Sequence, residues 1–151
     1  MKILIIEDDD YKLERLREFS KNYFENTIEI DISESLVEAI ESIQEEEYDL
    51  IFVDMSIPSH PIKVGQGNPV SLLTGGLKVI LTLNSMGRSD PCIIITQYPD
   101  IQISGISILT ENVKEKVKEL LDCEILECIY YKEESTDWET QLRSILKNSY
   151  L

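Results

Sequence analysis

Long apolar runs are missing from this 151-residue sequence, and their absence excludes whole classes of protein. No segment approaches the roughly 20 apolar residues with which a helix crosses a bilayer, so we expect no transmembrane span. The apolar run near the N-terminus, Ile3 to Ile6, is short and meets acidic residues at once. It is too short for the core of a signal peptide, and we therefore expect a cytoplasmic protein.

Basic residues are scarce. Lys and Arg number 14 against 29 Asp and Glu, which gives a formal net charge of -15. A field of this sign repels the phosphates of nucleic acids and the headgroups of anionic lipids. The composition therefore argues against direct binding to nucleic acid and against attachment to a membrane surface.

Cysteine and histidine are also rare. Cys92, Cys123 and Cys128 are an odd number and lack the spacing of a zinc site, so we expect them to be reduced and at or near the core. The single histidine, His60, lies in a segment rich in proline and glycine. A metal or phosphate contact is one interpretation of His60, but a solvated loop side chain is the simpler one.

What the sequence does contain is a pair of apolar runs that end in acids. Leu50 to Val53 is unbroken and is followed by Asp54, while Ile3 to Ile6 is followed by four acids at 7–10. Short apolar runs of this kind favour buried parallel strands, and ligands bind beyond the carboxyl ends of such strands. Asp54 alone could simply cap a helix or turn the chain. Two acidic strand ends that meet would repel each other, however, and Mg²⁺ is the usual remedy.

The rest of the chain continues the alternation of strand and helix. Strands are expected at residues 3–6, 27–32, 49–53, 92–95 and 125–131, and helices after caps at Asp9 or Asp10, Ser35, Thr110 and Thr136 and over 74–87. This order predicts an α/β fold with a parallel sheet, right-handed crossovers and helices on both faces. No repeat or linker interrupts it, so one domain over residues 1–151 is expected.

Three further segments are interpreted from composition. In the first helix, Lys12, Arg15, Arg17 and Lys21 interleave with acids and indicate a solvated face. The loop at 56–71 is unusually long, which is typical of a functional or mobile segment. Because it directly follows Asp54, we hypothesise that it folds over the acidic site and restricts which donor molecule can approach. Residues 99–109 alternate apolar and polar side chains around Gly105 and predict extended chain or a short hairpin.

Two more polar side chains stand at strand ends, Thr96 and Lys132. A carboxylate can attack a phosphoryl group and hold it as an acyl phosphate, provided that cations offset the charge of both partners. A lysine supplies a point charge for a phosphoryl oxygen, and a hydroxyl supplies a neutral donor. The sequence thus offers an acid, a hydroxyl and an amine at separate strand ends.

These motifs, taken together, resemble the response-regulator receiver domain of two-component signalling, the CheY-like superfamily. The resemblance spans nearly the whole chain and rests on Ile3–Asp9, Tyr48–Asp54 with Pro58, Gly76–Leu77, Ile93–Thr96 and Tyr130–Lys132. It implies a flavodoxin-like, doubly wound sheet of five parallel strands in the order 2-1-3-4-5.

The resemblance also implies roles for individual residues. Asp54 resembles the phospho-acceptor, Thr96 the switch hydroxyl and Lys132 the phosphoryl-binding lysine. Magnesium would be held by Glu7, Asp8, Asp54 and the backbone carbonyl of Ser56. The expected function is Mg²⁺-dependent phosphorylation of Asp54, donated by a histidine kinase, a histidine phosphotransfer protein or a small acyl phosphate. Phosphorylation would switch binding to a downstream protein or relay phosphate onward, without the chain being an enzyme in its own right.

The sequence departs from the family pattern at several places. Besides the longer loop after Asp54, Gln97 replaces a small residue after the switch hydroxyl, Ile129 stands where an aromatic is expected, and Glu133 replaces a proline after Lys132. These departures leave a second interpretation open, a receiver-like interaction module that signals without phosphate. A Mg²⁺-dependent aspartyl phosphohydrolase is the third interpretation, and Ser56 disfavours it because such enzymes usually carry an acid there.

Overall fold

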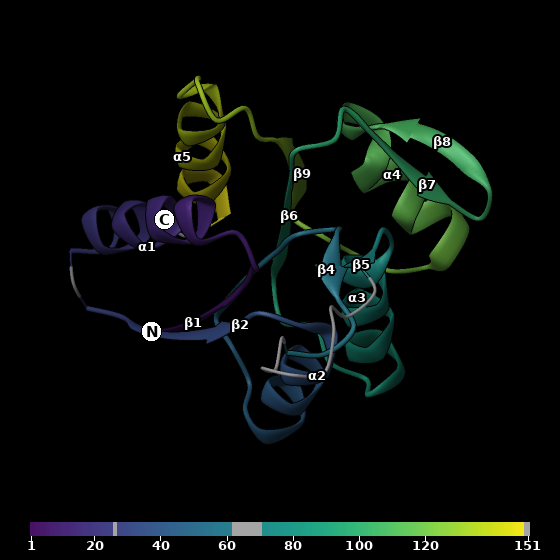
Figure 1. The fold of residues 1–151 in the computed structure, drawn as a ribbon, viewed down its shortest axis with the longest axis horizontal. Coiled ribbons are helices and arrows are strands. Elements are labelled where there is room, and N and C mark those ends of the chain that lie inside the picture. The colour runs from purple at the N-terminus through teal and green to yellow at the C-terminus, as the bar shows by residue number, and fades with distance from the viewer. Residues whose placement is uncertain (26, 62–70, 150–151) are drawn as a thin grey trace.

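A computed structural model describes residues 1–25, 27–61 and 71–149 of the chain. Its centre is a five-stranded parallel sheet in the order β2-β1-β3-β6-β9 (Figure 1). Counted along the chain, these strands are the first to the fifth of the sheet, so the order is 2-1-3-4-5. The predicted flavodoxin-like fold with helices on both faces is confirmed.

The elements follow the alternation expected from the sequence. The sheet strands are β1 (Lys2–Ile6), β2 (Glu29–Ser33), β3 (Leu50–Val53), β6 (Cys92–Thr96) and β9 (Glu127–Tyr130). The helices are α1 (Asp10–Tyr23), α2 (Leu36–Glu45), α3 (Gly75–Ser85), α4 (Thr110–Leu121) and α5 (Asp137–Ser149). Ser35 caps α2 as predicted, by accepting a hydrogen bond from the amide of Glu38. Thr110 does not cap α4, because it is the first helical residue and Leu109 occupies the cap position.

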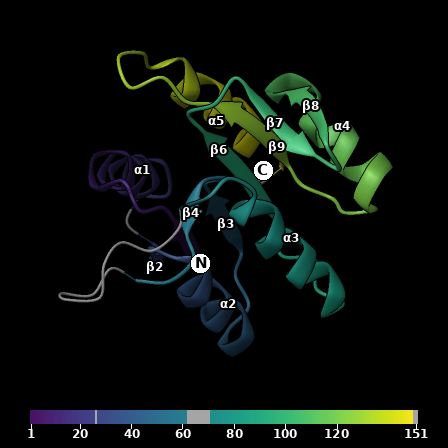
Figure 2. The same ribbon diagram turned by 45° about the vertical axis from the view of Figure 1, so that its right-hand side comes forward.

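One face of the sheet is covered by α1 and α5, which lie side by side in both ribbon views (Figures 1 and 2). Their apolar stripes, which include Leu16 and Leu142, pack against strand residues such as Ile5 and Phe52. Trp138 is buried here against the rings of Phe19 and Tyr131 and joins α5 to α1 and to the end of β9.

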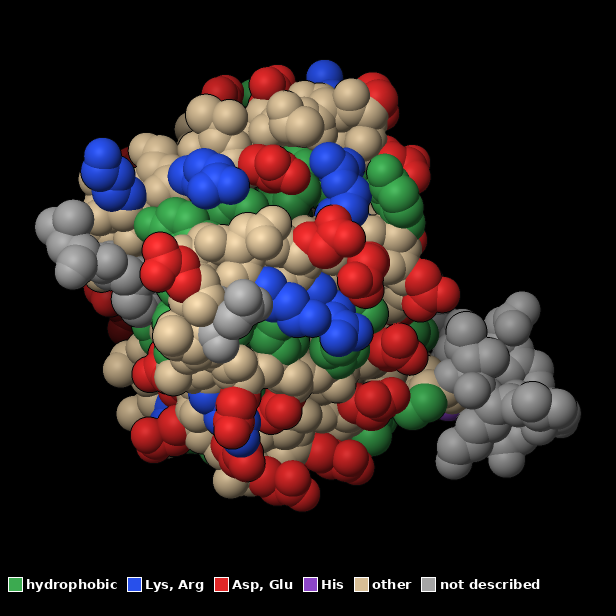
Figure 3. Space-filling model, turned by 90° about the vertical axis from the view of Figure 1, so that its left-hand side faces the viewer, with side chains coloured by type: hydrophobic (Ala, Val, Ile, Leu, Met, Phe, Trp, Pro, Cys, Tyr) green, Lys and Arg blue, Asp and Glu red, His purple; other side chains and the backbone are tan. Residues whose placement is uncertain are grey.

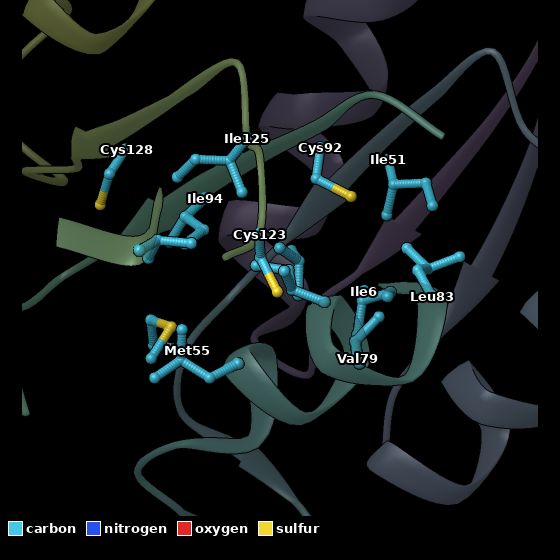
Figure 4. Packing of buried hydrophobic residues seen from close by; sticks show 14 of the residues in the cluster. Ile6, Ile51, Met55, Val79, Leu83, Cys92, Ile94, Cys123, Ile125 and Cys128 are labelled. Carbon is cyan, nitrogen blue, oxygen red and sulfur yellow. The ribbon is translucent and has the colours of Figure 1, made fainter. Parts of the chain in front are cut away.

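The other face is covered by α2, α3 and α4, whose buried side chains form a second core with the opposite sides of the same strands. Figure 4 shows part of this core, where Val79 of α3 lies beside Ile6 and Leu83 lies near Ile51, while Ile94 lies beside Ile125. The three cysteines are buried and free, as expected. Because both faces of the sheet are covered, functional groups on it are accessible only at its edges and strand ends.

Two short antiparallel pairs are added to this framework. β7 (Asp100–Ile103) pairs with β8 (Ile106–Leu109), which confirms the predicted hairpin around Gly105. β4 (Ile57–Pro58) pairs with β5 (Ser71–Leu72) and joins the two ends of the long loop. Residues 62–70 lie outside the described part, so the hypothesis that this loop restricts donors stays a prediction.

The surface carries both signs of charge. On the face drawn in Figure 3, Lys and Arg side chains lie among Asp and Glu rather than in a basic patch of their own. Of the helices in residues 1–25, 27–61 and 71–149, none is long and apolar enough to cross a membrane.

Candidate functional site

Three carboxylates meet where β1 and β3 end. Ligand oxygens of Glu7, Asp8 and Asp54 all lie within 4.8 Å of one another. Glu7 and Asp54 are almost completely buried, with 1% and 3% of their surface exposed, whereas Asp8 is exposed. Parallel pairing of β1 with β3 brings these strand ends together, and the amide of Asp54 donates to the carbonyl of Ile6 at 3.0 Å. The predicted acidic site is therefore present as a cluster.

The start of α3 packs closely against the backbone of Asp54 and Met55. A Cβ atom added to Gly76 would lie only 2.6 Å from the carbonyl oxygen of Asp54, closer than real Cβ atoms come to backbone. The amide of Gly76 also donates to the carbonyl of Met55 at 3.1 Å. Only glycine permits this approach, which explains why a glycine is needed at this point of the chain.

A lysine that sequence reasoning did not place in the site lies at its centre. The Lys12 ammonium is 2.7 Å from Glu7 Oε2 and 3.3 Å from Asp54 Oδ1, and its side chain is fully buried. It also donates to the carbonyl oxygen of Ile95 at 2.7 Å and to Gln97 Oε1 at 3.2 Å. One side chain from α1 thus joins the ends of β1, β3 and β6.

The prediction that Lys12 belongs to a solvated face is wrong. Lys12 lies four residues before Leu16, which is buried, so the two side chains share one face of α1. Buried lysines are rare unless paired, and the pattern of charges along α1 suggested solvent. The acids that pair with Lys12 come from β1 and β3, and only the folded chain brings them to it. Its spacing from Leu16 was the one signal that could have revealed it.

Burial dominates the electrostatics of the acids. Loss of hydration raises the pKa of Glu7 to about 8, although the Lys12 ammonium acts in the opposite direction. Burial likewise raises the pKa of Asp54, and Lys12 again opposes the shift. The pKa of Asp8 is raised by partial burial and by its acidic neighbours. When all three acids are ionised they carry more negative charge than the single Lys12 ammonium neutralises, so an additional cation would stabilise their charged forms.

The donor set fits a hard divalent cation. Glu7 Oε2 and Asp54 Oδ1 are buried and accept no well-aligned hydrogen bond, although both lie within ion-pair distance of Lys12. Glu7 Oε1 accepts from the amide of Asp9 at 3.1 Å, which fixes the orientation of that carboxylate. Clustered carboxylate oxygens of this kind are the ligands that Mg²⁺ prefers. Ser56, half-buried, follows shortly after Asp54, and the ligand role of its carbonyl stays a prediction.

Thr96 lies at the end of β6, the strand next to β3, and is fully buried. Its hydroxyl oxygen accepts a hydrogen bond from the amide of Tyr98 at 3.2 Å. Its carbonyl accepts from the amide of Tyr131 at 2.7 Å, which ties the end of β6 to that of β9. Thr96 is thus at the same edge of the sheet as Asp54, as expected from the sequence.

Lys132 lies apart from the acids. Its side chain is exposed, and its ammonium lies 5.4 Å from the centroid of the Tyr130 ring. Within the described residues, no acid lies within ion-pair distance of Lys132, whereas Lys12 contacts two. The structure therefore brings together four of the predicted strand-end residues and a different lysine.

The remaining candidates stand outside this cluster. His60 is exposed, and its Nδ1 forms a 2.8 Å hydrogen bond with the hydroxyl of Ser59, consistent with the simpler interpretation of this residue. Burial raises the pKa of the Cys92 thiol to about 12, so this thiol is not a nucleophile at neutral pH.

Comparison with known proteins finds a relative that covers nearly the whole chain. The chain is 32% identical over 148 residues to the Detocs response regulatory protein DtcB from Vibrio alginolyticus, covering 97% of this chain and 99% of that protein. No protein-family model matches the chain.

Solved structures share the fold at lower identity. The response regulatory domain of mrkE from Klebsiella pneumoniae superposes with a TM-score of 0.64 at 18% identity, covering 98% of this chain and 93% of that one. The N-terminal domain of a response regulator/sensory box/GGDEF 3-domain protein from Carboxydothermus hydrogenoformans gives 0.64 at 17% identity, covering 99% and 93%.

Proposed function

Since the chain belongs to the response-regulator family and has the fold of its receiver domains, we propose that it accepts a phosphoryl group on Asp54. The observation that carries this proposal is the position of Asp54, buried at a strand end and within 4.8 Å of two further acids. A carboxylate in this setting can act as a nucleophile towards phosphorus once its charge is offset.

The surrounding residues support this reaction in distinct ways. Glu7, Asp8, Asp54 and the carbonyl of Ser56 would hold Mg²⁺, which offsets the charge of the acids and of the incoming phosphoryl oxygens. The bond between phosphorus and the donor breaks as an Asp54 oxygen bonds to phosphorus, and the donor leaves with the electron pair. Thr96, at the neighbouring strand end, offers a hydroxyl that can donate to the phosphoryl oxygens of the product.

We infer that the phosphoryl donor is a histidine kinase or a histidine phosphotransfer protein, as the family resemblance implies. The phosphorylated state would then alter binding to a downstream protein or pass the group onward. The strongly acidic composition supports a protein partner rather than a nucleic acid.

Intact mass measurement tests the proposal. The full chain is incubated with acetyl phosphate and Mg²⁺, and the wild type is expected to gain one phosphoryl mass. Asp54→Asn should gain none, whereas the matched control Glu41→Gln, which removes an exposed carboxylate on α2, should behave as the wild type. Labelling of Asp54→Asn to the wild-type extent would reject Asp54 as acceptor, and an unlabelled wild type would reject the function.

A second function is favoured by one observation. Lys132 is exposed beside Tyr130 and forms no ion pair with the acids of the described site, so the amine expected at the phosphoryl group does not contact Asp54. If the chain signals without phosphate, its binding to a partner should be unchanged in Asp54→Asn. A pull-down that compares phosphorylated protein, unmodified protein and Asp54→Asn separates the two functions.

A further inference from the structure

We propose that Lys12, on α1, supplies the ammonium that contacts the phosphoryl group on Asp54, in place of Lys132. The inference rests on the proposed function, because it assigns the cation that this function needs. Its basis is direct contact, since the Lys12 Nζ lies 3.3 Å from Asp54 Oδ1.

The Lys12 ammonium contacts oxygen atoms at the ends of three different strands. Its four oxygen partners are Glu7 Oε2, Asp54 Oδ1, the Ile95 carbonyl and Gln97 Oε1. An ammonium has only three N–H donors, so these oxygens share them and one contact is weakened. The contact with Asp54, at 3.3 Å, is the longest of the four. It is therefore the contact that can be exchanged most easily for a new acceptor on Asp54.

A phosphoryl group supplies such an acceptor. Once an Asp54 oxygen is bonded to phosphorus, the terminal phosphoryl oxygens carry the negative charge that the carboxylate had. Charge-assisted hydrogen bonds to these oxygens are about twice as strong as neutral ones. Glu7 and the Ile95 carbonyl, each 2.7 Å from Nζ, hold the ammonium in place meanwhile. Lys12 contributes charge only, and no proton is transferred.

Gln97 supports the assignment independently. It replaces the small residue expected after the switch hydroxyl, and its side-chain oxygen accepts from Lys12 Nζ at 3.2 Å. The residue after Thr96 and the buried lysine of α1 therefore form a hydrogen bond with each other. A small residue at position 97 could not accept this bond, so Gln97 helps to hold the ammonium beside Asp54.

The position of Lys132 agrees with this exchange of roles. The residue before it, Tyr131, is buried between Lys12 and Trp138, with the Lys12 Nζ 5.4 Å from its ring centroid. Lys132 itself is exposed beside Tyr130. The positive charge that the end of β9 was expected to contribute is thus supplied by Lys12 of α1, which packs over the Tyr131 ring.

Two variants of matched chemistry test the proposal, Lys12→Met and Lys132→Met. Methionine keeps the length of the side chain and removes its charge, and it is compatible with a buried helix face. With acetyl phosphate and Mg²⁺, Lys12→Met should acquire phosphoryl mass roughly a hundredfold more slowly than the wild type, the cost typical of losing one charge-stabilising donor. Lys132→Met should stay within about twofold of the wild type, because its side chain contacts none of the reacting groups.

The exposed variant keeps the test decisive even if Lys12→Met fails to fold. A large loss of labelling in Lys132→Met would overturn the proposal, and so would a folded Lys12→Met that labels at the wild-type rate. Failure of the wild type to label at all would instead reject the proposed function, and the role of Lys12 with it.

Calorimetric titration with Mg²⁺ alone separates a charge effect from a merely structural one. Removing a positive charge beside Glu7 and Asp54 should strengthen Mg²⁺ binding by about tenfold in Lys12→Met, and leave it unchanged in Lys132→Met. Equal affinity in both variants would show that Lys12 only packs α1 against the sheet, and would overturn the proposal.

Discussion

At the residue scale, Asp54 and Glu7 are acids whose burial disfavours their charged forms. Each loses hydration, and Lys12 compensates for only part of the cost. Such destabilised sites are typical of function, because a protein has no structural reason to gather like charges in its interior. The cluster is therefore a stronger indication of chemistry than any one acid in it.

A prediction about stability follows for Asp54. Asp54→Asn removes one of the repelling charges and keeps the shape, so the midpoint of thermal unfolding should rise by about 3 °C in the absence of Mg²⁺. Because the pKa of Glu7 is raised from 4.5 to about 8, the folded state binds more protons than the unfolded state between these values. Wild-type stability should accordingly rise as the pH falls from about 8 towards 5.

Urea unfolding at several pH values measures this effect, with Glu41→Gln as the control for loss of one exposed carboxylate. The pH dependence should be smaller in Asp54→Asn, because the charge of Asp54 raises the pKa of Glu7. Wild-type stability that increases with pH across this window would contradict the account of the buried acids.

At the scale of elements, the β7–β8 hairpin is the main addition between β6 and α4. The hairpin is part of the hydrophobic core. Three of its isoleucines are buried in the same cluster as two valines of α4 (Ile101, Ile103 and Ile108 with Val113 and Val117). The hairpin therefore acts as part of the wall that supports α4 on the sheet, and its removal would expose apolar surface of the helix.

Two isoleucines of this hairpin form a matched pair for mutagenesis. Ile103 is 1% exposed and Ile106, the residue paired with it across the turn, is 54% exposed. Ile103→Ala should lower the free energy of unfolding by about 2–4 kcal/mol, because it leaves a cavity. Ile106→Ala should change it by less than about 0.5 kcal/mol. Denaturant titration measures both, and equal effects would show that the hairpin does not pack as described.

At the scale of the whole molecule, the acids and the hydroxyl of the site lie at the carboxyl ends of adjacent strands, and α1 adds Lys12 to them. The order of the strands places the ends of β1, β3 and β6 next to one another, although the residues are far apart in the chain. The scaffold is held by two cores, one on each face, while the charge is concentrated at the surface and at this edge. Most of the stability thus comes from the two apolar cores, whereas the site residues oppose folding through their buried charge.

The net charge of -15 leads to a prediction for the whole molecule. Repulsion among surface acids opposes the compact state, and salt screens it. Raising NaCl from about 20 mM to about 300 mM should therefore raise the midpoint of thermal unfolding by about 2–4 °C in Asp54→Asn as well as in the wild type. Circular dichroism measures the shift. If NaCl raised the midpoint of thermal unfolding in the wild type only, the repulsion that salt screens would come from the acidic site and not from the overall charge.

The sequence was sufficient to predict the strands and the acidic site, because both depend on a local pattern of residues. The apolar runs that end at Ile6 and Val53 located the central strands, and the acids after them located the site. The contacts of Lys12 could not be predicted, because its partners come from three different strands and no local pattern records them. For Lys132 the sequence indicated a strand end, but not that Tyr131 would take the buried position and leave Lys132 in solvent.

The pairing of β4 with β5 has a consequence for how this protein can be altered. The pairing, with Ile57 opposite Leu72, joins the chain shortly after Asp54 to the chain shortly before Gly76. The distance between Asp54 and Gly76 is therefore set by this pairing and not by the length of the intervening segment. A change in the number of residues between Pro58 and Ser71 would therefore leave this pairing, and with it the close approach of Gly76 to the Asp54 backbone, in place.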